Sequence, residues 1–204
     1  MSSRAGDDDI WIGTRDTTTQ AFTVLRLTIV SASPAVDQSP ELSQDGGTLY
    51  FASDRTGNFD IYRSKLEPGG WTPPLRVDAL STSSNDTDFA MSPDGMTAIL
   101  ARSGKLHRST RATTSDVWGP TAQLAGTFPT NPTSAALDGT QHLYFHATGN
   151  DRDLFHAAWL GSAYDLPAKI DELSTALRDA APSVSADGRY MMFERTGKIV
   201  QTSR

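Results

Sequence analysis

An Asp-Gly pair recurs four times along this chain, at residues 45, 94, 138 and 187, with spacings of 49, 44 and 49 residues. Asp-Gly is typical of the tight turn between two antiparallel strands, and we expect both turn residues to need a positive φ. A short β-prone run follows each pair, at residues 49–51, 98–100, 143–145 and 190–193. The chain is therefore a repeat protein built from hairpins, which excludes helical-repeat folds of similar period.

The rest of the repeat supplies two further strands per unit. A glycine (Gly57, Gly104, Gly149 or Gly197) precedes a third run at residues 60–63, 105–108, 153–156 and 198–201, and an extra copy of that run lies at residues 9–12. A fourth run is clearest at residues 75–77 and 168–170. One aromatic residue lies between the third and fourth runs, and its recurrence favours packing between units: Phe22, Trp71, Trp118 and Tyr164.

Four short strands, a to d, in roughly 45 residues are the signature of a propeller blade. We predict an all-β chain in which residues 1–204 form a single β-propeller of four-stranded antiparallel blades. The repeats span residues 39–86, 87–132, 133–180 and 181–204, with N-terminal strands in residues 9–30. We favour four blades, with the N-terminal strands closing the last blade and removing its exposed edge. In that arrangement both residues 9–12 and residues 198–201 would be strand c of the last blade. An incomplete five-bladed ring, with an edge open to a homodimer partner, therefore stays as the alternative.

The first repeat is the most complete, and it resembles the TolB-type (WD-like) β-propeller repeat. The resemblance rests on Pro40-Glu41-Leu42-Ser43-Gln44-Asp45-Gly46, on Leu49-Tyr50-Phe51, and on Ser53-Asp54-Arg55 followed by Gly57 and Asp60-Ile61-Tyr62. It implies the propeller fold and a role in scaffolding, in binding or as a non-catalytic domain of a larger enzyme. It also implies a periplasmic or extracellular location, although residues 1–9 contain no apolar segment of a signal peptide.

Composition narrows the classes of function. The 204 residues carry a net charge of −6, which argues against a nucleic-acid partner, and they contain no cysteine for disulfides or thiolate chemistry. No apolar run reaches the ~18 residues of a membrane span. The sequence also lacks a nucleophile elbow, a phosphate-binding loop and a zinc-protease motif. We predict no cofactor and no catalytic residue.

The polar residues of the d–a and b–c connections share one rim of a propeller, and they are the candidate ligand-binding residues: Asp37, Arg55, Asp88, Arg102, Asp179 and Arg195. The three arginines occupy equivalent places, and such a ring of guanidinium groups could hold a carboxylate or phosphate. Alternatively, each arginine pairs with an acidic residue of a neighbouring loop and ties the blades together.

Two classes of function follow from these rim residues. The first is a non-catalytic binding or protein-interaction module, whose partner is a protein, a small polar ligand or a carbohydrate. The second is a carbohydrate-active or other hydrolytic propeller that uses Asp37, Asp88 and Asp179. The second requires two carboxylates within about 5–10 Å of each other, one of them with a raised pKa. The missing catalytic motifs favour the first.

Histidines gather in the third repeat, at positions 142, 146 and 156. Along one strand His142 and His146 would lie ~13 Å apart, too far to share one ion, so we predict a surface or edge-strand role for them. The acidic loops at residues 7–9 and 54–60 lack the ligand pattern of a calcium loop. We therefore predict no metal site.

Overall fold

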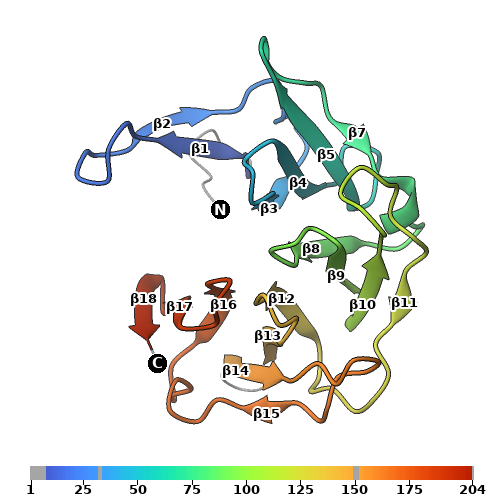
Figure 1. Ribbon diagram of the computed structural model, residues 1–204, viewed down its shortest axis with the longest axis vertical. Coiled ribbons are helices and arrows are strands. Elements are labelled where there is room, and N and C mark those ends of the chain that lie inside the picture. Colours follow the sequence, from blue (N-terminus) through green and yellow to red (C-terminus); the bar gives the residue numbers. More distant parts are fainter. Residues whose placement is uncertain (1–7, 32–33, 149–151, 204) are drawn as a thin grey trace.

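The computed structural model describes residues 8–31, 34–148 and 152–203, and it is an all-β propeller (Figure 1). Four inner strands surround the central axis: β3 (Asp37–Leu42), β8 (Asp86–Met91), β12 (Pro132–Leu137) and β16 (Asp179–Val184). Each of these strands begins one antiparallel sheet, so the propeller has four blades, as the repeat predicts. Gly149, the predicted turn residue of the third repeat, lies outside the described residues.

The outer strands follow in chain order within each blade. Blade one adds β4 (Thr48–Ser53), β5 (Asp60–Glu67) and β7 (Leu75–Arg76), with β6 (Gly70–Trp71) extending β5 as a hairpin; a short 3-10 turn, η1 (Asp78–Leu80), follows. Blade two adds β9 (Thr97–Arg102), β10 (Lys105–Thr110) and β11 (Ala122–Gln123). Blade three adds β13 (Leu143–Thr148), β14 (Arg152–Ala157) and β15 (Ala168–Lys169), and blade four adds β17 (Tyr190–Arg195) and β18 (Lys198–Ser203).

The N-terminal strands do not close the last blade, which corrects the prediction. Within the described residues, β1 (Trp11–Thr14) and β2 (Thr23–Arg26) form a two-stranded sheet of their own, and blade four has three strands. The N-terminal pair lies instead beside blade one, where Ile10 and Val30 pack on Leu49 and Phe51. The physical reason is that β18 already fills the place of strand c in blade four.

The a–b hairpins depart from the expected turn geometry. Gly46, Gly95 and Gly188 have φ of 70°, 72° and 69°, but the preceding aspartates do not have a positive φ. Each of these aspartates instead accepts hydrogen bonds within its turn; Asp45 Oδ1, for example, accepts from the Ser43 hydroxyl at 2.6 Å and the Gly47 N–H at 2.9 Å. Only the glycine therefore needs the left-handed conformation.

Every inner strand carries a β-bulge at its third residue. Ser39, Asp88, Ser134 and Ala181 hold equivalent positions with φ of 49–52°, and the strand register shifts at each of them. A bulge leaves one residue out of the hydrogen-bonded ladder and redirects its side chain. The four bulges thus bring one residue per blade toward the axis of the ring.

Apolar side chains fill the spaces between successive blades. Tyr50 of blade one, for example, stacks on Phe89 of blade two at 4.6 Å between ring centroids, with Trp118 edge-on to both rings. The repeated aromatic is therefore packed between blades at Trp118 and Tyr164, and it is partly buried at Trp71. Phe22 is the exception, since it is 56% exposed at the edge of the N-terminal pair.

Candidate functional site

Buried ion pairs occupy the rim of three blades. Arg55 donates to Asp37 at 2.8 Å, Arg195 donates to Asp179 at 2.6 Å, and Arg102 pairs with Asp86 in the same way. The three carboxylates belong to the first residue of β3, β16 and β8, and all three are fully buried.

Each of these arginines also donates to a backbone carbonyl in the segment that leads into its blade: Val30, Leu80 or Leu173. The guanidinium therefore joins strand b to the d–a connection. At Asp179 burial acts to raise the pKa, but hydrogen bonds from Arg195 and Thr175 outweigh it, so the pKa lies below its usual range. The arrangement matches the alternative in which the repeated arginines tie the ring together.

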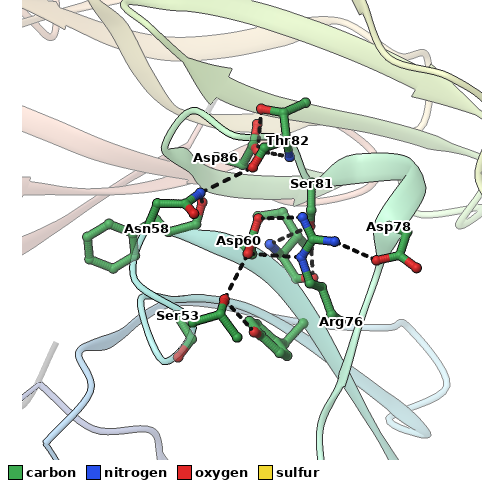
Figure 2. A network of polar contacts seen from close by, with 12 residues as sticks. Ser53, Asn58, Asp60, Arg76, Asp78, Ser81, Thr82 and Asp86 are labelled. Atoms are coloured by element: carbon green, nitrogen blue, oxygen red, sulfur yellow. Dashed lines mark hydrogen bonds and ion pairs between the residues drawn. The ribbon is translucent and has the colours of Figure 1, made fainter.

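A second polar network links the outer strands of blade one to blade two (Figure 2). Asp60 accepts from Arg76 at 2.9 Å, and Arg76 also reaches Asp78. The Asn58 amide donates to the backbone carbonyls of Thr82 and Ser84, which lie just before β8. The loop of residues 54–60 is therefore a structural connector between blades.

Blade three breaks the pattern of rim ion pairs. Pro132 and Ala147 are paired across β12 and β13 at the positions that hold Asp86 and Arg102 in blade two. One step inward, Thr133 is paired with His146, where blade two has Thr87 and Ala101. The repeat has thus lost a charged pair here and gained a histidine.

The bulge residue Asp88 lies at the centre of a hydroxyl cluster that spans three blades. Its carboxylate accepts from Ser39 of blade one at 3.1 Å and Ser134 of blade three at 3.4 Å, and it also accepts a short hydrogen bond from Thr133. Thr87 is a further donor, at 3.3 Å. Asp88 therefore lies apart from the ion pairs of Asp37 and Asp179, and its oxygens are held by hydroxyl groups.

His146 is buried beside this cluster, which makes the predicted surface role wrong. Its side chain is 2% exposed, and Nδ1 accepts the backbone N–H of the bulge residue Ala181 at 3.2 Å. Burial, followed by the charge of Arg152, lowers its pKa to about 4, so the imidazole is neutral at pH 7. Nδ1 accepts, so Nε2 carries the hydrogen. This buried Nε2 has no hydrogen-bond partner among the described residues.

Glu41 provides an ionisable group on another inner strand, two residues after the bulge of β3. Two small adjoining cavities of about 100 and 250 Å³ include Glu41 in their walls, together with apolar residues such as Met91, Leu137 and Val184. Burial raises the pKa of Glu41 to about 7, despite a lowering by a backbone hydrogen bond from Met91. Among the residues that the structure describes, no charged neighbour contributes to that shift.

The sequence did not single out Glu41. The corresponding positions of the other inner strands hold Ala90, Ala136 and Ser183, so one charged residue replaces a run of small ones. This difference between the repeats is the sequence signal by which Glu41 could have been identified as a candidate site residue. Among the described residues, no group of three or more histidine, aspartate or glutamate side chains is arranged to hold a metal ion; Asp7 lies outside them.

Solved structures share this architecture. No protein-family model and no curated protein matches the sequence. TolB from Acinetobacter baumannii is similar to 89% of this chain with a TM-score of 0.61 and 14% identity, and putative TolB from Agrobacterium tumefaciens to 89% with 0.59 and 16%. The chain has the fold of the TolB-type β-propellers.

A chain of the nidogen/laminin complex is also similar, with a TM-score of 0.61 and 13% identity over 88% of this chain. This chain spans 46% of the A. baumannii TolB and 62% of the A. tumefaciens protein, so it matches only part of each. Separately, the described residues contain no helix with the length and apolar character that a membrane crossing requires.

Proposed function

We propose that this chain is a non-catalytic binding module, and that its partner docks on the rim and places a polar group in the channel. The observation that carries the proposal is the Nε2–H of His146, which is buried beside the Asp88 cluster and has no partner in the described part of the chain. A buried donor without a partner is costly, and a ligand that supplies an acceptor recovers that cost. The rim charges, by contrast, are already paired within the fold.

The partner must offer a hydrogen-bond acceptor, because the imidazole is neutral and its free nitrogen is a donor. A carbonyl or hydroxyl oxygen of a protein segment, or of a small polar ligand such as a carbohydrate, meets this requirement. The TolB-like fold is compatible with an exported protein, so we place the partner in the periplasm or outside the cell.

A hydrolytic propeller is the second candidate, because similar structures include a gluconolactonase from Xanthomonas campestris and a puromycin-hydrolyzing peptidase from Mycobacterium tuberculosis. The geometry favours it less. Glu41 has the raised pKa that a general acid needs, but no second carboxylate contributes to that shift, and Asp88 is surrounded by hydroxyl groups. Two converging carboxylates are the requirement for glycoside hydrolysis.

Glycan and peptide arrays test the binding role, with His146→Phe compared against His142→Phe. His146 is buried beside the Asp88 cluster, whereas His142 is a partly exposed histidine of the same blade. We expect wild-type protein to retain one class of ligand, His142→Phe to bind equally well, and His146→Phe to lose most of the signal at a temperature where circular dichroism shows it to be folded. Equal binding by all three proteins contradicts the channel site.

Incubation with p-nitrophenyl glycosides, gluconolactone and aminoacyl arylamides separates the two candidates. A binding module releases no product from these substrates. Turnover that Asp88→Asn abolishes would instead establish the hydrolytic alternative, since that substitution keeps the size of the side chain and removes its charge.

A further inference from the structure

A groove of about 500 Å³ lies between blades one and two, on the face that carries the a–b hairpins. One wall comes from β4 and β5 of blade one, and the other from the hairpin before β9 and the loop after β10. This face is opposite the rim, because a–b turns and b–c turns lie at opposite ends of strand b. A volume of this size suits a small organic molecule.

Three basic side chains line the groove. Arg63 and Lys65 are two residues apart on β5, so they project from the same face of the blade, and Arg111 approaches from blade two. Within residues 8–31, 34–148 and 152–203, no carboxylate lies within ion-pair distance of any of the three. In a chain with a net charge of −6, unpaired cations gathered in one groove indicate an anionic ligand.

Arg111 is held in place before any ligand arrives. Its Nε donates to the Gly95 carbonyl at 2.7 Å, one terminal nitrogen reaches the Tyr50 hydroxyl at 3.4 Å, and the guanidinium lies 4.2 Å from the centre of the Trp118 ring. A side chain that is already ordered loses little conformational entropy on binding. Its remaining N–H groups form a planar fork that fits a carboxylate.

Two aspartates also line the groove, and they limit the charge of the ligand. Asp45 and Asp94 each direct Oδ1 into their own hairpin, and hydrogen bonds from Ser43 and Gly47 lower the pKa of Asp45, so it is ionised at pH 7. By formal charge, three basic and two acidic side chains leave the groove with one net positive charge, which matches a monoanion better than a phosphate dianion. Met91 and the partly exposed Pro93 add an apolar surface to the lining.

We propose that this groove binds a small organic monocarboxylate, with its carboxylate on Arg63 and Arg111 and its apolar part against Met91 and Pro93. This site is separate from the channel, so the proposal does not depend on whether the channel binds a partner.

Isothermal titration calorimetry with benzoate tests the site, with benzamide as the uncharged analogue and inorganic phosphate as the competing anion. Arg63→Gln is the informative variant, because Arg63 has no partner among the described residues and its loss should leave the melting temperature unchanged. Lys105→Gln is the matched control; it removes one exposed cation from β10, outside the groove.

We expect saturable binding of benzoate but not of benzamide, and a Kd about tenfold higher in Arg63→Gln, as for the loss of one charge-assisted hydrogen bond. Lys105→Gln and the channel variant His146→Phe should keep the wild-type Kd. The proposal is overturned if benzoate gives no saturable heat, if Lys105→Gln weakens binding as much as Arg63→Gln, or if phosphate binds more tightly than benzoate.

Discussion

At the scale of single residues, burial shifts the pKa of His146 and of the partly buried Glu41 in opposite directions. Burial lowers the pKa of His146 to about 4 and raises that of Glu41 to about 7, so in both cases burial favours the neutral form. Neither effect could be predicted from the sequence, because each depends on which neighbouring blade covers the side chain. His146, for instance, is covered by the bulge of β16, 35 residues further along the chain.

The raised pKa of Glu41 predicts a dependence of stability on pH. The folded state binds its proton more tightly than the unfolded state, so stability is greatest below the unfolded pKa of ~4.3 and falls as the pH rises toward about 7. Glu41→Gln has no carboxyl group to ionise at this position, so the variant does not lose this stability as the pH rises. We expect urea unfolding to show the variant gaining about 1–3 kcal/mol relative to wild type between about pH 4.5 and pH 8, at roughly 1.4 kcal/mol per unit of pKa shift.

Glu67→Gln is the control for this experiment, since Glu67 is an exposed glutamate at the end of β5. It should reproduce the wild-type profile. A Glu41→Gln profile parallel to that of wild type would show that the carboxyl group is solvated.

The hairpin glycines allow a test of the backbone alone. Gly46 has φ of +70° and no atom within 4 Å of the position that a Cβ would occupy, and Gly69 has equally open surroundings without a positive φ. Gly46→Ala should therefore lower the free energy of unfolding by about 1 kcal/mol through backbone strain. Gly69→Ala should be neutral or slightly stabilising. Equal effects in thermal unfolding would argue against the left-handed turn.

At the scale of strands and connections, the sequence predicted where the strands lie better than which side chains and strands they contact. Asp-Gly pairs and short β-prone runs located the strands of all four blades, because turn chemistry and strand propensity are local. Pairing of each arginine with an acidic residue of a neighbouring loop was one of two alternatives, since sequence spacing does not say whether an arginine points into the fold or into the channel. The place of β1 and β2 depends on packing against Leu49 and Phe51, which no local pattern reveals.

We expect the two partners of each rim ion pair to be strongly coupled in their effect on the free energy of unfolding. Arg102→Met leaves the fully buried carboxylate of Asp86 without its cation and should cost about 3–5 kcal/mol. Adding Asp86→Asn removes the orphaned charge, so the double variant should recover much of that loss. Chemical unfolding of the single and double variants measures the coupling.

An arginine outside the rim supplies the control. Arg189 is exposed on the a–b hairpin of blade four, and Arg189→Met should change stability by less than about 0.5 kcal/mol. Additive effects of the Arg102 and Asp86 substitutions would mean that the ion pair contributes nothing specific to the ring.

At the scale of the whole molecule, the propeller has one blade face that differs from the others. The first apolar residue of strand c is buried in blades one to three, as Ile61, Leu106 and Leu154, but its equivalent Ile199 is 75% exposed. On the adjacent strand Met192 is 48% exposed, whereas its equivalent Tyr50 is buried. In each earlier blade this face packs against the next blade, so an apolar surface is left uncovered on blade four.

An uncovered face of this kind favours self-association, in line with the homodimer expected at an open blade edge. We expect sedimentation velocity to show a concentration-dependent dimer of the chain, and Ile199→Glu to shift it to monomer without lowering the melting temperature, since the side chain is solvated in the monomer. Leu160→Glu places the same charge at an exposed leucine between β14 and β15 and should leave the dimer intact. A monomer at all concentrations, or a dimer that persists in Ile199→Glu, would exclude this face as the contact.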